Sequence, residues 1–381
     1  MQTASPPSPT VQQLREAFRE PGNFTLGVEE EVMLVDRQTL DLIPQAKPAL
    51  ERVCGDDRFK LELPASQLEI VTPALSSAAE IQEFLTAARA DLAAAVSDLG
   101  GVMSAGVHPF AAASGPVHRD GRYEGVAQEY GPVAERQLVC ALQVHVAVPG
   151  ERRALAVYNA LRSHLPALAA LAANAPYHEG VDTGMASVRP SICQQLPRQG
   201  VPPAIESFEA LAADWAWGAR AGTLVRPARW WWELRPHPLH GTLEVRVPDA
   251  QTTPEDAAAV AAVVHALVRW LAERHDAGEE LAVEPSWRIA ENRWSAYRHG
   301  LGGQHADLRS GQRTPMREHL SALLETLAPV AAMLNAGPQL EHAQRLAVAG
   351  GAERQRAIAS ERGVRGLAAW LMGRFTGRAG G

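Results

Sequence analysis

The stretch FTLGVEEEVMLVD, residues 24–36, sets three consecutive glutamates into an otherwise apolar and β-branched run. Side chains alternate between the two faces of a strand, so Glu29 and Glu31 are predicted on one face and Glu30 on the other. Two carboxylates spaced this way lie roughly 7 Å apart and repel by about 2 kcal/mol at an effective dielectric of about 20. The run is therefore either an edge strand whose acids are solvated or one wall of a cation site.

Composition limits the kinds of partner that the chain can have. It has 381 residues, 46% of them hydrophobic, and a formal net charge of -7. This balance indicates a globular protein and argues against nucleic acid or an anionic membrane as a partner. The opening lacks a signal-peptide pattern and no apolar run has the length of a membrane span, so a cytoplasmic protein is expected.

Several catalytic classes are excluded by missing residues. The only lysines are Lys47 and Lys60, and the chain contains no GxxxxGK[ST], GxSxG, HExxH or GxGxxG motif. The three cysteines, Cys54, Cys140 and Cys193, are widely spaced and form no CxxC pair, which argues against a disulfide framework or a zinc knuckle. Metal ions and arginines are left as the groups that could hold a nucleotide.

The pattern along the chain predicts one α+β catalytic domain over residues 23–381. Residues 1–22 form the preceding segment, with 1–10 expected to be disordered and 11–19 to form a short helix. A capping box at Ser77 and Glu80 opens a helix that ends at residues 100–101. Further helices are expected over residues 151–174, with an interruption near Pro166, and from Thr253 to about His275. Strands are expected at residues 59–63, 67–72, 101–109, 137–148 and 241–249.

These strands share one design, an apolar face opposite a face that carries ionisable groups. The ionisable positions are Glu29, Glu31, Glu62, Glu69, Glu244 and His145. Solvated outer faces are one interpretation, but each acid lies in a run apolar enough to be internal. Carboxylates with one imidazole suit Mg2+ or Mn2+, and two such ions fit a site that binds polyphosphate.

Two expectations follow for single residues of this face. On repulsion alone, removing the charge of Glu29 or Glu244 is expected to stabilise the metal-free protein. Glu30, which points away, is expected to be dispensable for metal binding.

Eight motifs in order give the chain a resemblance to a known family over residues 23–345. They are LGVEEE, SQLEIVTP, GVHPF, RYEGVAQEYG, LQVHVAV, GMASVRPSI, ELRPHPLHGTLEVRVPD and ENRWSAYRHGL. The chain resembles the carboxylate-amine ligases of the glutamate-cysteine ligase type 2 family, the YbdK-like proteins. The resemblance implies a glutamine-synthetase-like fold, in which a curved antiparallel sheet forms a funnel with helices packed on its outer face.

The resemblance also implies the metal sites and the catalytic residue. One metal between the ATP phosphates would be held by Glu29, His145 and Glu244. A second metal, which meets the acceptor carboxylate, would be held by Glu31, Glu62 and Glu69. Arg246 would stabilise the transferring phosphoryl group, a task that suits a guanidinium.

Other matched positions have weaker assignments. Arg189 and Arg235 would bind a substrate carboxylate, although either could be a structural arginine. Asn292, Arg293 and Arg298 would reach nucleotide or substrate, with helix-surface pairing as the alternative.

The implied reaction is ATP-dependent amide formation through an acyl phosphate, with Mg2+ or Mn2+ as cofactor. The partners would be small-molecule carboxylates and amines, with amino acids as the expected class, and glutamate-cysteine ligase activity would be weak at most. A homodimer is a further expectation. A metal-dependent amide hydrolase and an inactive ligase-like binding protein are the alternative functions.

The chain departs from the family at one motif. Family members commonly read GLHVHVG or GQHVHVG where residues 141–147 read ALQVHVA, so Gln143 replaces a histidine while Ala141 and Ala147 replace glycines. Replacing glycine by alanine narrows the predicted funnel, and the changes at this motif bear on which substrates are accepted.

Overall fold

The computed structural model describes residues 8–19, 23–224 and 229–377. The disorder expected for residues 1–10 falls mostly on residues 1–7, which lie outside the described residues. Helix α1, Val11–Ala17, begins at Thr10, whose hydroxyl accepts the Gln13 N–H. No helix in the described part of the chain combines the length and apolar character that a membrane span needs.

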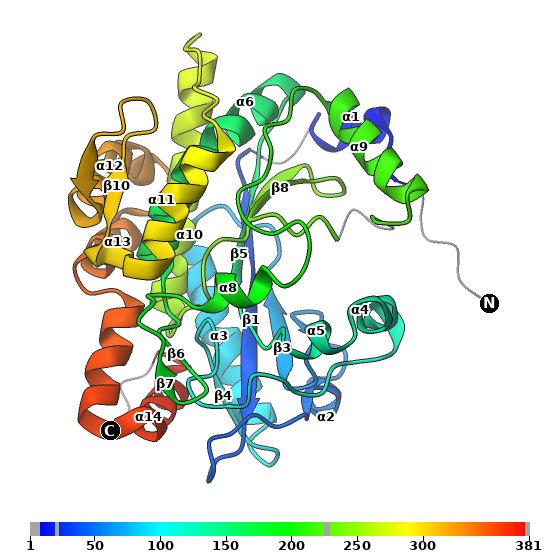
Figure 1. The fold of residues 1–381 in the computed structure, drawn as a ribbon, viewed down its shortest axis with the longest axis vertical. Coiled ribbons are helices and arrows are strands. Elements are labelled where there is room, and N and C mark those ends of the chain that lie inside the picture. Colours follow the sequence, from blue (N-terminus) through cyan, green and yellow to red (C-terminus); the bar gives the residue numbers. More distant parts are fainter. Residues whose placement is uncertain (1–7, 20–22, 225–228, 378–381) are drawn as a thin grey trace.

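The centre of the molecule is a seven-stranded antiparallel sheet with the order β2-β3-β1-β5-β9-β8, to which β4 adds beside β1. Figure 1 shows β1, in dark blue, running through the middle of the molecule. The sheet strands are β1 Leu26–Val35, β2 Phe59–Leu61, β3 Gln67–Val71, β4 Gly101–Met103, β5 Leu142–Ala147, β8 Leu234–His237 and β9 Thr242–Val245. Two small hairpins are formed by β6 Tyr177–His178 with β7 Val181–Asp182, and by β10 Gln304–Ala306 with β11 Arg313–Pro315.

Helices make up the rest of the ordered structure. The α-helices after α1 are α2 Ala46–Arg52, α3 Ala78–Ala95, α4 Glu124–Tyr130, α5 Pro132–Glu135, α6 Glu151–Leu161, α7 Leu165–Ala172, α8 Arg189–Cys193, α9 Phe208–Arg220, α10 Pro254–Asp276, α11 Ser286–His299, α12 Met316–Met333, α13 Gly337–Val348 and α14 Gly351–Arg374. Short 3-10 helices are η1 Gly121–Tyr123, η2 Arg162–His164 and η4 Gly300–Gly302.

The apolar face of the sheet packs against helices, with α10 at the centre. Helix α10 is buried on nearly all sides and contacts α3, α6 and β5. Its Val260 and Val264 share one core with Val28 of β1 and Val144 of β5. Residues 257–268 of α10 are apolar except for His265, and a segment that is apolar all round is stable only inside a core, which explains why α10 is central. The predicted α+β class, with helices on one face of an antiparallel sheet, is confirmed.

Glu30 and Arg89 form a fully buried ion pair within this helical layer. The Arg89 Nε donates to Glu30 Oε2 at 2.8 Å and Nη2 donates to Oε1 at 2.5 Å, with both side chains fully buried. The Arg89 Nη1 also donates to the carbonyls of Thr252 and Phe375 at 3.0 and 2.9 Å. One side chain of α3 thus joins β1, the start of α10 and the end of α14. The predicted orientation of Glu30, away from Glu29 and Glu31, is confirmed.

Helix boundaries follow the predicted signals with two corrections, the first being that α3 ends at Ala95 and not at residues 100–101. Ser77 caps α3 by accepting the Glu80 N–H at 3.3 Å, but the Glu80 carboxylate accepts from Ser76 N–H, so the reciprocal half of the capping box is not formed as expected. The expected interruption near Pro166 appears as η2 between α6 and α7, and α10 ends at Asp276, close to the predicted end.

The Glu30 pair yields a test of stability. Replacing Arg89 with methionine leaves a buried carboxylate without its counter-charge, and we expect the free energy of unfolding to fall by about 3–5 kcal/mol. Urea denaturation measures this change. The matched control is Arg52→Met, which removes an arginine whose partner Asp98 is exposed, and its midpoint is expected to stay unchanged. Equal effects of the two substitutions would contradict the role of the buried pair.

Candidate active site

The strand register gathers the charged residues on the face of the sheet opposite α10. Directly paired residues of antiparallel strands share a face. Glu31 of β1 is paired with Glu69 of β3, and His145 of β5 is paired with Glu244 of β9. Glu29 lies opposite Gln143 of β5. Period-2 alternation therefore brings acids that are distant in the sequence onto one surface.

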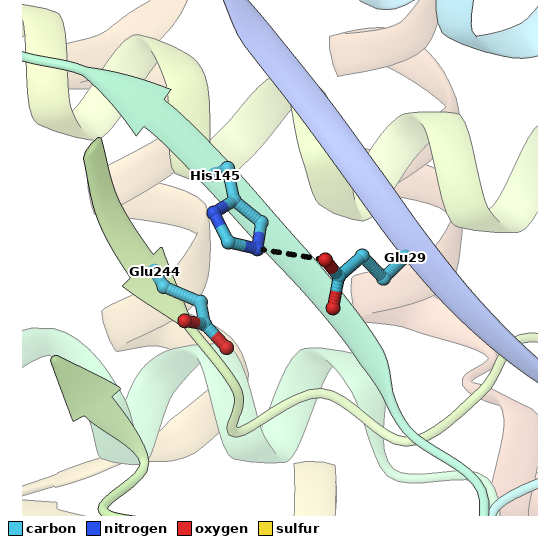
Figure 2. Close-up of side chains that lie close together, drawn as sticks. All are labelled: Glu29, His145 and Glu244. Atoms are coloured by element: carbon cyan, nitrogen blue, oxygen red, sulfur yellow. Dashed lines mark ion pairs between the residues drawn. The ribbon is translucent and has the colours of Figure 1, made fainter. Parts of the chain in front are cut away.

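The first cluster consists of Glu29, His145 and Glu244 (Figure 2). One potential ligand atom from each residue lies within 4.8 Å of the others. The His145 Nε2 is 3.7 Å from Glu29 Oε1, and Nδ1 is hydrogen-bonded to Thr242 Oγ1 at 3.0 Å. Nε2 is buried and has no hydrogen-bond partner among the residues that the structure describes. An imidazole oriented through one nitrogen, with the other beside two carboxylates, is the arrangement that a divalent cation needs.

The second cluster consists of Glu31, Glu62 and Glu69, again with ligand atoms within 4.8 Å of one another. Glu31 is oriented by the residue that precedes β5, since the Ala141 N–H donates to its Oε2 at 2.6 Å. Glu62 was expected on a strand, but β2 ends at Leu61. The Glu62 carboxylate instead accepts the Leu63 N–H at 3.1 Å, and Pro64 lies too close for the ladder to continue.

The second cluster has too little positive charge around it to keep all three of its carboxylates ionised. Burial, followed by repulsion from Glu62, raises the pKa of Glu31 to about 7. Burial raises the pKa of Glu69 well above its usual value, with Glu62 as the next cause. Burial also raises the pKa of Glu62. The three carboxylates therefore resist ionising together, and a bound divalent cation would offset their repulsion.

The first cluster is compensated differently. Burial alone would raise the pKa of Glu244, but Arg235 and Arg246 outweigh it and hold that pKa well below its usual value. The Arg235 Nε donates to Glu244 Oε2 at 2.6 Å, and Arg246 Nη1 donates to Oε1. The expectation that removing the charge of Glu244 stabilises the metal-free protein is therefore reversed, since that charge is needed by the buried Arg235 and the half-buried Arg246.

The remaining predicted residues are engaged elsewhere in the protein. Arg189 is buried and donates to Asp249 Oδ1 at 2.7 Å. On α11, the Asn292 amide pairs with the backbone of Ala306, and Arg293 donates to Glu233 at 2.8 Å. Arg298 is half-buried beside Gly184. The structure does not bring the α11 residues into either acidic cluster, and their binding roles stay predictions.

Some residues at the site had no predicted role. The Arg122 Nη2 lies 3.2 Å from Glu62 and 3.9 Å from Glu69, and Tyr123 donates to Glu62 at 3.3 Å. The motif RYEGVAQEYG contains both residues, but a loop has no periodicity from which their direction could be predicted. The rings of His237 and His240 are stacked with their centroids 4.3 Å apart, and the ring centroids of His237 and His145 are 5.5 Å apart.

Comparisons with known proteins point to one family. The model of glutamate-cysteine ligase family 2 matches residues 25–367. A Rubrobacter xylanophilus protein named "Putative glutamate--cysteine ligase 2-3" is 40% identical over 347 residues, covering 89% of this chain and 93% of the relative. A Jannaschia sp. protein with a name of the same type is 32% identical over 341 residues, covering 88% and 90% of the two chains.

Solved structures agree at the level of the fold. The glutamate-cysteine ligase of Francisella tularensis, solved in complex with AMP, superposes with a TM-score of 0.68 at 12% identity, covering 95% of this chain and 90% of that one. A bifunctional glutathione synthetase of Pasteurella multocida gives a TM-score of 0.63 at 15% identity, covering 96% of this chain and 53% of that one.

The raised carboxyl pKa values of the second cluster yield a pH prediction. Because folding raises these pKa values above 4.5, protonation stabilises the metal-free protein, and its stability is expected to fall as pH rises from about 4.5 through 7. Mg2+ needs the ionised carboxylates. We therefore expect Mg2+ to raise the Tm more at pH 8 than at pH 5.5, which thermal unfolding at fixed Mg2+ concentration measures. An equal rise at both pH values would contradict this.

The different compensation of the two clusters predicts opposite effects of the same substitution. Glu69→Gln removes a repelled charge, so the metal-free protein at pH 8 is expected to gain about 1–2 kcal/mol. Glu244→Gln leaves Arg235 and Arg246 without their carboxylate, so a loss of about 3 kcal/mol is expected. Denaturant unfolding in the presence of a chelator measures both. Changes of the same sign would count against the assignment of charges.

Proposed function

Since the chain belongs to glutamate-cysteine ligase family 2, we propose that it joins a carboxylate to an amine at the expense of ATP, through an acyl phosphate. Membership makes it an ATP-dependent ligase that forms carbon-nitrogen bonds. The observation that carries the finer proposal is that two acidic clusters share one sheet face, with Arg246 hydrogen-bonded at the border between them. This arrangement suits polyphosphate on one side and a carboxylate on the other.

The residues present fit two divalent cations. Hard carboxylate oxygens suit Mg2+ or Mn2+, and the unpartnered His145 Nε2 completes the first set. Glu29, His145 and Glu244 would hold the ion that binds the ATP phosphates. Glu31, Glu62 and Glu69 would hold the ion that binds the substrate carboxylate. Bound ions supply positive charge that screens the phosphate oxygens.

In the proposed reaction, a substrate carboxylate oxygen attacks the γ-phosphorus of ATP and the bond to the departing ADP oxygen breaks. Arg246 donates hydrogen bonds to the transferring phosphoryl group, whose charge spreads over its equatorial oxygens. The amine then attacks the carbonyl carbon of the acyl phosphate. The carbon-oxygen bond to phosphate breaks, which releases phosphate and a proton and leaves the amide.

No protein nucleophile takes part in this sequence. The buried Cys140 is near Glu31, and burial raises its thiol pKa well above the usual value, so it stays protonated. Burial likewise raises the pKa of Cys193. Both thiols are poor nucleophiles in this state. Their chemistry thus agrees with direct transfer from ATP to the substrate.

Small amino acids are the proposed substrate class. The relatives carry the glutamate-cysteine ligase name, and the resemblance to the YbdK-like branch supports weak activity at most for glutamate with cysteine. Ala141 adds a methyl group beside Glu31, and Ala147 adds one at the other end of β5, opposite Thr242. Both alanines are buried. A narrower wall favours smaller carboxylates or amines.

ADP release in the presence of ATP, Mg2+ and pools of carboxylates and amines tests the proposal. Turnover is expected only when both substrates are present, and Arg246→Lys is expected to lower kcat by about 100-fold because the fork geometry is lost. Arg52→Met, at the exposed pair with Asp98, is the matched control and is expected to keep full activity. ATP-independent amide hydrolysis, or turnover without an amine, would contradict a ligase.

A further inference from the structure

Gln143 lies between the two acidic clusters. It is hydrogen-bonded to Glu31 of the second cluster and to Arg246, which is bonded to Glu244 of the first. Its Nε2 donates to Glu31 Oε1 at 3.0 Å, and its Oε1 accepts from Arg246 Nη1. The residue is on β5, opposite Glu29, and only 3% exposed. A buried side chain with both polar ends satisfied has a single stable orientation.

The direction of this amide is dictated by its partners. A guanidinium can only donate and an ionised carboxylate can only accept, so the amide oxygen must face Arg246 and the nitrogen must face Glu31. The same Arg246 Nη1 donates to Glu244 Oε1. A continuous chain of hydrogen bonds therefore runs from Glu31 through Gln143 and Arg246 to Glu244, from the second cluster to the first.

The two ends of the Gln143 amide fix the orientations of Glu31 and Arg246, and no other described contact replaces either hydrogen bond. Both Glu31 oxygens accept hydrogen bonds, Oε2 from the N–H of Ala141, which precedes β5, and Oε1 from Gln143 of β5. Without the amide, Glu31 keeps one bond and can rotate. Arg246 keeps Glu244, which pulls it toward the first cluster, and loses the contact that draws it toward the second.

We propose that Gln143 is a positioning residue that aims Glu31 at the second metal site and holds Arg246 between the two clusters. The inference rests on the proposed function for its catalytic part, while its metal-binding part stands on the Glu31 contact alone. The amide is neutral, so it links the clusters without adding charge to either.

Mn2+ binding tests the first part without any knowledge of the substrates. In the wild-type protein we expect calorimetry to detect two Mn2+ ions. Gln143→Leu is expected to weaken the affinity for one of these ions by about 10-fold and to leave the affinity for the other unchanged. A loss of this size is typical when a group that orients a metal ligand is removed. Gln38→Leu, an exposed glutamine beyond β1, is the control and is expected to change neither. Unchanged binding of both ions in Gln143→Leu would overturn the inference.

A second variant separates loss of the Gln143 contacts from misfolding. Gln143→Asn keeps the amide but is one methylene shorter, so it cannot reach both Glu31 and Arg246. It is expected to weaken the same ion by a similar factor. Thermal unfolding of both variants reports whether the fold is retained, and normal Mn2+ affinity in a folded Gln143→Asn would also count against the inference.

A double-mutant cycle in the ligase assay tests the second part. If Gln143 acts through Arg246, then Gln143→Leu lowers kcat by about 10-fold in the wild-type background and by less than 2-fold when Arg246→Lys is already present. Additive effects would overturn the positioning of Arg246. Absence of wild-type turnover would remove the proposed function but leave the Mn2+ result as the test of Gln143.

Discussion

The structure depends on how one sheet accommodates buried negative charge on both of its faces. Glu29, Glu30 and Glu31 are adjacent, yet β1 sends the middle one into the helical layer, where Arg89 neutralises it, and the other two to the opposite surface. The pleat separates charges that would repel if they shared a face. A one-residue shift of register would bury two unpaired carboxylates against α10, so the Glu30 pair also fixes the register on which both acidic clusters depend.

The two clusters balance their charge by different means, which gives them different chemistry. Arg235 and Arg246 hold the pKa of Glu244 well below its usual value, so this carboxylate stays ionised to lower pH than an ordinary glutamate. In the second cluster the main cationic neighbour of Glu62 and Glu69 is Arg122, whose side chain is 52% exposed and therefore screened by solvent. The first cluster is pre-organised before any ion binds. The second releases protons when a cation binds, and its occupancy therefore depends on pH.

Strand periodicity predicted which acids would meet, because alternation and antiparallel pairing are local and strict. It placed Glu29, Glu31, Glu69, His145 and Glu244 on one face before their partners were known, and the ladder confirms this placement. Positions without periodicity were placed less well. Glu62 was predicted on a strand, but β2 ends at Leu61, and the approach of Arg122 from a 3-10 turn was not predicted. Ion-pair partners such as Arg89 for Glu30 could not be predicted either, because residue spacing within a segment carries no information about ion pairs between distant elements.

The arginines bear on how a substrate carboxylate would be recognised. Arg189 is committed to Asp249 and to the carbonyl of Val247, and Arg235 is committed to Glu244 across the β8–β9 ladder. Asp249 also accepts from the Asn174 N–H and the Ser187 hydroxyl, and Glu244 also accepts from Arg246, so both arginines belong to larger buried hydrogen-bond networks. The substrate-binding roles of Arg189 and Arg235 stay predictions. In the proposed reaction the second cluster also contributes to recognition of the carboxylate, and its acids contact it only by way of a cation. This requirement couples substrate binding to metal occupancy, and it makes the orientation of Glu31 by Gln143 and Ala141 part of substrate recognition.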